Sequence, residues 1–252
     1  AIGGELGGLI IQSQFDGEDA GLTGTLTNGG TIVSGSGTAA QFSAGLASVV
    51  VDNGGTISGA TIGVGHGTDG TMTLTNSGTI AGGVTGVESD AGGAMTLVNS
   101  GTISGETGAA FISLTQTSLD NAGILSGGSG VAVQLGAFDD GVTLRTGSAI
   151  TGTVDAGDGT DTLTLDGDIL ELTEAQQLTA SSGFEQLDVA AGYWSTSGFV
   201  GEFGNVTIDE GASLQVNEVD LGEEGTSSPV LTSTVRADGF VASRVGSGSF
   251  TA

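Results

Sequence analysis

Three aspartates past the middle of the chain, Asp155, Asp158 and Asp161, are residues of the type that binds a divalent cation. Residues 156–163 read A-G-D-G-T-D-T-L, which is similar to one nonapeptide of the calcium-binding pattern G-G-x-G-x-D-x-U-x, in which U is aliphatic. In such repeats calcium lies between successive turns and takes oxygen ligands from them. Only one copy is present, and Ala156 replaces the first glycine. The sequence therefore predicts either a calcium site or a polar corner, and no other cofactor.

Nucleophilic catalysis by a Ser-His-Asp triad requires a histidine base, and the sequence has one histidine, His66. Asp69 follows nearby, but glycines flank His66 on both sides and predict a corner of the chain. No G-x-S-x-G segment occurs, and a zinc site would need further His or Cys ligands. We therefore predict no catalytic residue and classify the chain as a non-enzyme.

Glycan hydrolysis is the alternative activity, because it needs only two carboxylates. The pairs Asp139/Asp140 and Glu223/Glu224 qualify, although such pairs are expected by chance in a chain this acidic. Trp194 beside Tyr193 could stack on a sugar ring, or could pack in a core. A hydrolase acting on glycans is therefore kept as the second hypothesis.

The elements that must position these residues come from a repeated phrase, L-x-N-x-G-T-I-x-G in its fullest form. Its copies begin 22 to 25 residues apart, and a more divergent copy places Thr146 at the asparagine position. A fixed period of this length is typical of a solenoid. The repeated asparagines are Asn28, Asn53, Asn76, Asn99 and Asn121.

Within each copy, aliphatic residues alternate with small polar ones, as in M-T-L-T-N at 72–76, which indicates a strand with one buried face. The N-x-G segment provides a tight corner. Stacking of such units predicts an all-β, right-handed parallel β-helix of roughly ten coils, with an antiparallel sandwich as the alternative. Equivalent residues should then form one ladder of the five asparagines and a second ladder of Ile32, Ile57, Ile80 and Ile103.

We predict four segments along this solenoid. Residues 1–23 form an N-terminal coil or cap, 24–170 the regular coils, and 183–252 further coils of the same solenoid. Residues 171–182 are predicted as a short helical excursion, because Thr173 and Gln176 have the spacing of a capping box.

Composition excludes several partners. The chain has no Lys, three Arg and 29 acidic residues, for a net charge of −26. Such a surface repels phosphate groups, so we expect no nucleic acid partner and no binding to anionic lipid. It has no cysteine, so stacked strands must supply the stability that disulfides provide in some secreted proteins.

Four segments together resemble the passenger region of bacterial autotransporters, the type V secretion family. They are N-S-G-T-I-A-G at 76–82, G-D-G-T-D-T-L-T-L at 157–165, G-F-E-Q-L-D-V-A-A-G-Y-W at 183–194 and V-T-I-D-E-G-A-S-L-Q-V at 206–216. The resemblance spans roughly residues 25–216. It implies a right-handed parallel β-helix carried outside a Gram-negative cell by an outer-membrane barrel, which this sequence does not include and which would be the only membrane contact.

From the resemblance we expect an extracellular structural or adhesive protein at the cell surface or outer membrane. Its partners would be other copies of itself, in a fibre or surface layer, or a host or abiotic surface. A more distant alternative is an ice- or mineral-binding face made of outward threonines, such as Thr73 and Thr75.

Overall fold

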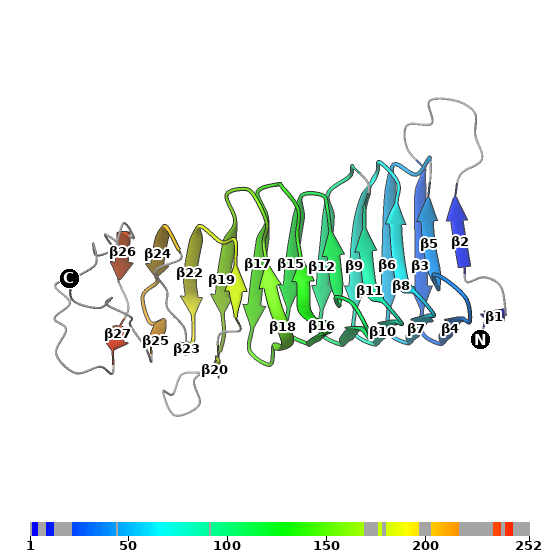
Figure 1. Ribbon diagram of the computed structural model, residues 1–252. Helices are drawn as coiled ribbons and strands as arrows, with labels where there is room; N and C mark the ends of the chain where they lie inside the picture. Colours follow the sequence, from blue (N-terminus) through cyan, green and yellow to red (C-terminus); the bar gives the residue numbers. More distant parts are fainter. Residues whose placement is uncertain are drawn as a thin grey trace.

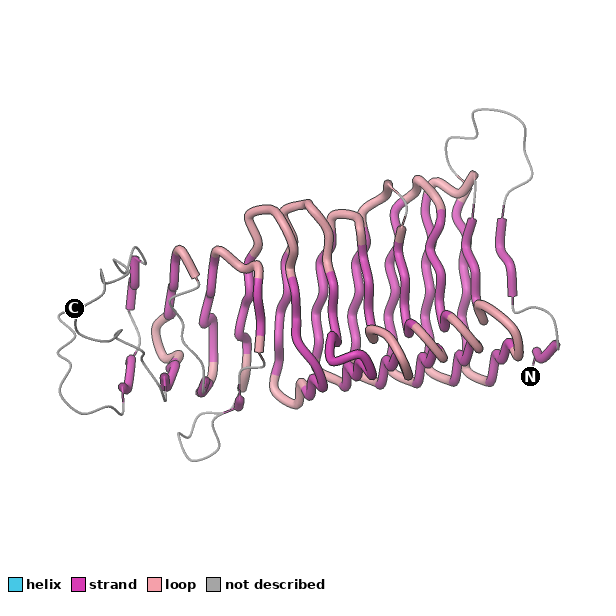
Figure 2. The backbone as a smooth tube through the Cα atoms, in the orientation of Figure 1, coloured by secondary structure: helices cyan, strands magenta, loops and turns pink. Residues whose placement is uncertain are grey.

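The computed structural model describes residues 2–4, 9–12, 22–43, 45–90, 92–168, 176–177, 180–196, 203–216, 234–237 and 240–243. Within these residues the protein contains strands and loops and no helix (Figure 2). Every strand pair is parallel and joins one coil to the next, for example Ile57 with Ile80. The structure therefore confirms the predicted parallel β-helix and excludes the antiparallel sandwich.

A ten-stranded sheet runs the length of the rod and takes one strand from each successive coil (Figure 1). Its strands, in stacking order, are β3 (Thr23–Asn28), β6 (Ser48–Asn53), β9 (Thr71–Asn76), β12 (Met95–Asn99), β15 (Thr117–Asn121), β17 (Gly141–Arg145), β19 (Thr162–Asp166), β22 (Gln186–Ala191), β24 (Asn205–Ile208) and β26 (Thr234–Ala237).

A thirteen-stranded sheet forms the other two sides of the N-terminal coils. One arm consists of β1 (Ile2–Gly4), β4 (Thr31–Ser34), β7 (Thr56–Gly59), β10 (Thr79–Gly82) and β13 (Thr102–Gly105). The other arm consists of β2 (Leu9–Gln12), β5 (Ala40–Ser43), β8 (Ile62–Gly67), β11 (Thr85–Ser89) and β14 (Phe111–Ser113). Both arms pair with the long strand β16 (Ile124–Gln134), which is followed by β18 (Ala149–Asp155) and β21 (Ser181–Ser182).

The C-terminal coils have a third, four-stranded sheet in place of the two arms. It contains β20 (Gln176–Gln177), β23 (Tyr193–Thr196), β25 (Ser213–Val216) and β27 (Phe240–Ser243). Because β22 pairs with β19, these coils continue the same solenoid. Within the predicted helical excursion at 171–182, β20 and β21 are strands; residues 171–175 and 178–179 lie outside the described part of the chain.

The core is a narrow column filled by the alternating aliphatic residues. In β9, Met72 and Leu74 are at most 1% exposed, while the threonines between them face solvent. Burial of one such side chain contributes roughly 1.5–3 kcal/mol. Ile32, Ile57, Ile80 and Ile103 pair directly from coil to coil, followed by Leu125 and Ile150. The repeat thus places like side chains in contact with like side chains.

The five asparagines form a second continuous row at the first corner of each coil. The side-chain amide Nδ2 of each of the first four donates to the Oδ1 of the asparagine in the following coil, over 2.7–2.8 Å. The Nδ2 atoms of all five lie 3.1–3.4 Å from the carbonyl oxygen two residues later in their own coil. The row satisfies polar groups that are at most 7% exposed, and all of its amides point toward the C-terminal end.

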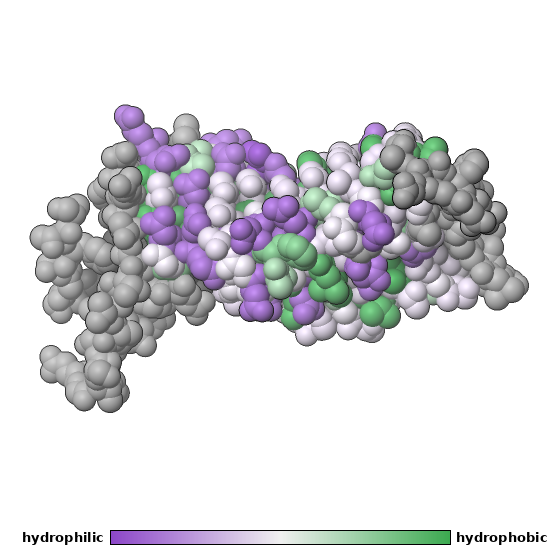
Figure 3. Space-filling view, turned by 90° about the horizontal axis from the view of Figure 1, so that it is seen from above, coloured by the Kyte–Doolittle hydropathy of each residue, from purple (hydrophilic) through white to green (hydrophobic). Residues whose placement is uncertain are grey.

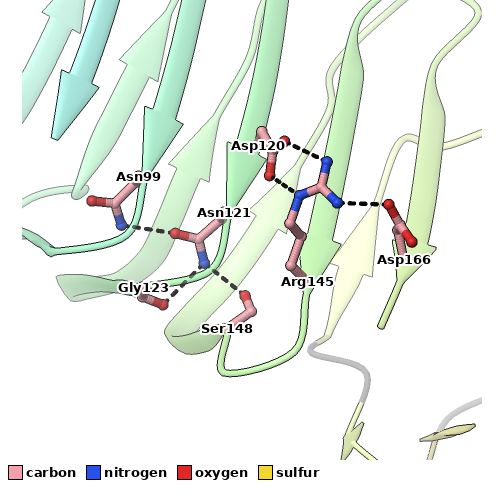
Figure 4. A network of polar contacts seen from close by, with 7 residues as sticks. All are labelled: Asn99, Asp120, Asn121, Gly123, Arg145, Ser148 and Asp166. Carbon is pink, nitrogen blue, oxygen red and sulfur yellow. Dashed lines mark hydrogen bonds and ion pairs between the residues drawn. The ribbon is translucent and has the colours of Figure 1, made fainter. Parts of the chain in front are cut away.

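The asparagine row contains the five predicted residues and ends at Asn121, but the residue aligned with it in the next coil is not the predicted Thr146. Leu144, not Thr146, pairs with Asn121, because this coil has two extra residues between the strand and the corner. Ser148 enters from this longer turn, and its Oγ accepts the last amide from Asn121 at 2.6 Å (Figure 4). From here on the row is aliphatic, since Leu144 pairs with Leu165 and Leu165 with Val189.

Replacement of an asparagine inside the row should cost more stability than replacement at its end. Asn76→Leu leaves both Asn53 Nδ2 and Asn99 Oδ1 without their side-chain partners, so we expect a loss of about 2–4 kcal/mol in unfolding free energy. Asn121→Leu removes one partner inside the row, that of Asn99, and places leucine against Leu144, so about 1–2 kcal/mol is expected. Urea denaturation of the two variants measures the difference, and equal losses would contradict a cooperative amide row.

Candidate functional site

The three aspartates predicted to bind calcium occupy different environments around one corner. Asp155 ends β18, and its carboxylate accepts a hydrogen bond from Ser182 Oγ at 3.1 Å. Asp158 is exposed, and Asp161 is fully buried just before β19. Among the described residues, no three His, Cys, Asp or Glu side chains are grouped so that they could hold a metal ion. Calcium at these residues stays a prediction.

What the structure does assemble at this corner is a column of carboxylates, each accepting a backbone N–H from the coil before it. Asp140 accepts from Thr117 at 2.6 Å, Asp161 from Asp140 at 2.7 Å, and Glu185 from Asp161 at 2.8 Å. At the corner where the chain enters the ten-stranded sheet, carboxylate oxygens thus accept the hydrogen bonds that join one coil to the next. This acidic column consists of Asp140, Asp161 and Glu185.

Two oxygens of the acidic column are buried without a hydrogen-bond partner among the described residues, Oδ2 of Asp140 and Oδ2 of Asp161. The side chains are 3% and 0% exposed. Burial raises the pKa of Asp140 to about 6. The hydrogen bond from Thr117 acts to lower this pKa, and the nearby charges of Asp161 and Asp139 act to raise it. Burial likewise raises the pKa of Asp161, assisted by the charge of Glu185. Burial therefore favours the protonated form of Asp140 and of Asp161.

Glu185 is not among the candidate site residues predicted from the sequence, and Asp140 is named there only as one of a carboxylate pair for glycan hydrolysis, not with Asp161. A signal for them is present: each member stands two residues before the first buried aliphatic of a strand, namely Val142, Leu163 and Leu187. The repeated order acid-x-aliphatic-x-aliphatic marks the corner. It can be recognised once the register of the strands is known, and the irregular spacing of 21 and 24 residues obscures it in the sequence.

His66 lies in the thirteen-stranded sheet, in strand β8, and is 1% exposed. Its Nε2 is 3.0 Å from the carbonyl oxygen of Gly70, and its Nδ1 is 2.8 Å from Ser89 Oγ. Because a carbonyl only accepts, Nε2 carries the proton and the hydroxyl of Ser89 donates to Nδ1. This resembles a nucleophile and its base, but Ser89 is 0% exposed, so the pair acts as an internal structural contact in this arrangement.

The indole of Trp194 packs in the core, where it is 1% exposed and its Nε1 donates to the carbonyl of Ala191 at 2.9 Å. A sugar could not stack on it there. Of Glu223 and Glu224, the second predicted carboxylate pair, nothing is described, because both lie outside the described residues.

An open groove of about 510 Å³ crosses four consecutive coils and is lined by their small corner residues. Residues 58–60, 81–83 and 104–106 contribute to it, with Ser126 and Gly128 from the next coil. Glycine is required at this corner: a Cβ on Gly82 would collide with the backbone of Thr85, and one on Gly59 with the backbone of Ile62. The groove is thus a by-product of the tight turn, and Glu106 is its one ionisable lining residue.

One arginine ties three coils together on the outer face of the ten-stranded sheet. Arg145 Nε and one terminal nitrogen donate to the carboxylate of Asp120, both at 2.7 Å, and the other terminal nitrogen reaches Asp166 at 2.6 Å (Figure 4). The bidentate geometry is favourable, although the exposed side chains limit its contribution to stability. The contact nevertheless places one positive charge between two negative charges on a strongly acidic rod.

Comparison of the chain with protein-family models, curated proteins and solved structures finds no match. In the described part of the chain, no helix is long and apolar enough to cross a membrane. The argument for function therefore depends on the fold and on the geometry of its faces and ends.

The acidic column should make stability depend on pH. The pKa of Asp140 is higher in the folded state than in the unfolded chain, so its contribution to stability is present below about pH 4 and is lost as the pH rises through about 6. Asp140→Asn removes this titration. We expect the unfolding free energy of the variant, relative to wild type, to increase as the pH rises from 4 to 8, as measured by urea denaturation with a chelator present.

The matched control is the exposed Asp158→Asn in the same corner, which removes one negative charge without touching a buried group. Its difference from wild type should change much less over this range. An equal change in both variants would mean that overall charge, and not the buried column, sets the pH dependence.

His66 should titrate below its ordinary range. Burial lowers its pKa below 6.5 and outweighs the bond to Gly70 and the charge of Asp90, which both act to raise it. Since His66 is the single histidine, one imidazole proton resonance reports it without assignment. An NMR titration should give a midpoint below 6.5. The contribution of His66 to stability should fall as the pH drops from 6.5 through that midpoint. A midpoint at or above 6.5 would contradict this burial.

Proposed function

We propose that the chain is a non-catalytic, extracellular β-helix of the bacterial cell surface, with a structural or adhesive role as in the autotransporter passengers that its sequence resembles. In this proposal the rod itself is the functional part, because it displays flat faces at a distance from the cell. Self-assembly into a fibre or surface layer, with copies of the same chain as partners, belongs to the same proposal.

The observation that carries the proposal is the continuous coil-to-coil pairing of the ten-stranded sheet. One sheet continues from β3 to β26, and rows of isoleucine and asparagine reinforce it on the inside (Figure 1). Each interior strand of this sheet therefore pairs with a strand of the coil before and of the coil after, which makes a stiff spacer. A stiff spacer of this kind is better suited to display a surface away from the cell than to catalyse a reaction that requires a conformational change.

The described surface also supports a display role. The view from above shows hydrophilic side chains interspersed with small separate hydrophobic groups (Figure 3). Large apolar residues that are exposed, such as Val50 and Val98, stand singly among threonines on the outer face of the ten-stranded sheet. This mixed face can touch another surface over a wide area without being sticky enough to aggregate.

The alternative of a glycan hydrolase has less support from the geometry. Such an enzyme needs two carboxylates facing each other across a cleft, roughly 5–10 Å apart. The groove contains a single carboxylate, that of Glu106, and Asp140 of the predicted pair is 3% exposed. The ice- or mineral-binding alternative also has less support, because Val50 and Asp52 interrupt the rows of Thr25 and Thr27 between one coil and the next.

A gene deletion in the source bacterium tests the proposal. Antibody should label the chain on intact cells, and cells lacking the gene should adhere to surfaces or to each other several-fold less than wild type. Wild-type chain should restore adhesion, and so should Asp139→Asn/Asp140→Asn, because the proposed role needs no carboxylate chemistry. Labelling only after permeabilisation, or failure of this variant when it is folded and displayed, would contradict the proposal.

A further inference from the structure

The turns that lead into the ten-stranded sheet form one edge of the rod, which Figure 3 shows from above. Two consecutive turns on this edge, at 114–116 and 135–140, each carry a large exposed apolar side chain. Leu114 is 53% exposed and Phe138 is 47% exposed, the two highest values among the large hydrophobic residues of the described chain. The range 92–168 is described without a gap, so both turns are complete.

The two apolar side chains belong to neighbouring coils and have little beside them. A Cβ on Gly136 would lie 3.1 Å from the Cα of Leu114, so this glycine is the neighbour of Leu114 in the next coil. Phe138 follows two residues later, and its own neighbour is Gly159, where a Cβ would collide with the carbonyl oxygen of Phe138. Because glycine has no side chain, neither position offers cover to the apolar residue beside it.

Carboxylates flank this apolar pair on both sides along the rod. Asp90 and Leu114 each follow directly on the last residue of a strand, β11 and β14, and these two strands pair, so the exposed Asp90 lies one coil before Leu114. On the other side, Asp139 stands next to Phe138, and Asp158 is exposed in the following turn. The view from above shows a hydrophobic group near the middle of the described face with hydrophilic groups on both sides (Figure 3).

The negative charge on this edge has no counter-charge among the described residues. Asp139 and Asp158 both act to raise the pKa of Asp161, so these carboxylates lie within reach of one another. The described turns of the edge contain no Arg, and the chain has no Lys. Arg145 stands at the far end of its strand, where two carboxylates already bind it. A cationic group from outside the chain would therefore find favourable partners on this edge.

These properties select the kind of partner. Nucleic acid and anionic lipid present negative charge to a surface that is itself negative, so both are repelled. A second copy of this chain, with three Arg against 29 acidic residues, is repelled for the same reason. A polypeptide that carries an apolar side chain beside Lys or Arg matches both the apolar pair and its flanking carboxylates.

We propose that the edge at Leu114 and Phe138 binds a cationic partner polypeptide. An apolar side chain of the partner packs against these two residues, and Lys or Arg on either side of it face Asp90 on one flank and Asp139 and Asp158 on the other. The charges accelerate association and lose strength in salt, whereas the apolar contact fixes the position. The inference names a partner for the proposed adhesive role but does not depend on that role, because the experiment uses the purified chain.

A short blocked peptide, K-K-L-F-K-K, serves as the probe, with E-E-L-F-E-E and K-K-S-S-K-K as control peptides. We expect saturable binding of the first peptide in an NMR titration, with the largest shift changes at the methyl groups of Leu114 and the ring of Phe138. High salt should weaken this binding. E-E-L-F-E-E should not bind, and K-K-S-S-K-K should bind about tenfold more weakly, because it lacks the apolar contact.

Paired variants of the chain locate the contact. Leu114→Ser/Phe138→Ser should weaken binding of K-K-L-F-K-K about tenfold and leave the fold intact, since both side chains are exposed. The matched control is Val50→Ser/Val98→Ser, which removes two side chains that are 41% and 40% exposed on the outer face of the ten-stranded sheet and should bind like wild type. Thermal denaturation followed by circular dichroism verifies that both variants are folded.

Two results would overturn the proposal. Equal affinity of wild-type chain for K-K-L-F-K-K and K-K-S-S-K-K, or equal weakening in the two variants, would mean that the peptide follows only the overall charge. Self-association of the wild-type chain that Leu114→Ser/Phe138→Ser abolishes would identify a second copy as the occupant. Neither result bears on the labelling of intact cells or on the adhesion of the deletion strain, which test the proposed function separately.

Discussion

The register between neighbouring coils is the constraint on which the rest of this structure depends. Parallel strands about 4.8 Å apart bring residues 22 to 25 positions apart in the sequence into direct contact. Once that register is set, one inward position must be aliphatic in every coil, and one corner must repeat the same polar group. The chain meets both requirements by repeating a phrase, since a side chain that packs well against a copy of itself can be stacked indefinitely.

The five repeated asparagines made this register readable from the sequence, and so the coil architecture and the two ladders could be predicted before any coordinates. The residue that follows Asn121 in this row could not be predicted. Two residues inserted between Leu144 and Ala149 keep the isoleucine position in register while they displace the asparagine position, and only the pairing of Asn121 with Leu144 reveals it. Alignment of the repeats by sequence matches similar residues, whereas the register of the backbone is set by the hydrogen bonds between strands.

The predicted calcium site shows the same limit, namely that contacts between coils cannot be inferred from a local motif. The motif around Asp158 and Asp161 is local and easy to see, but the partners of Asp161 are Asp140 and Glu185, which lie 21 and 24 residues away. Acids are frequent in this chain, so their types alone could not single out the two that are hydrogen-bonded to the coil of Asp161. The short helix expected around residue 176 failed for a related reason: a capping pattern is a weak local preference, and the edge of a neighbouring strand outweighs it where β20 pairs with β23.

The asparagine row becomes aliphatic after Asn121, and the acidic column begins at the opposite end of the same strands, so the rod has two chemically distinct halves. Coils that contain asparagine present the same acceptor on one face and the same donor on the other, so any one of them could be duplicated or lost without creating a mismatch. A coil from the acidic half inserted among them would break the amide row. Evolution can therefore lengthen or shorten this rod by gene duplication within the first half, while the turn at Ser148 marks a boundary across which repeats cannot be exchanged.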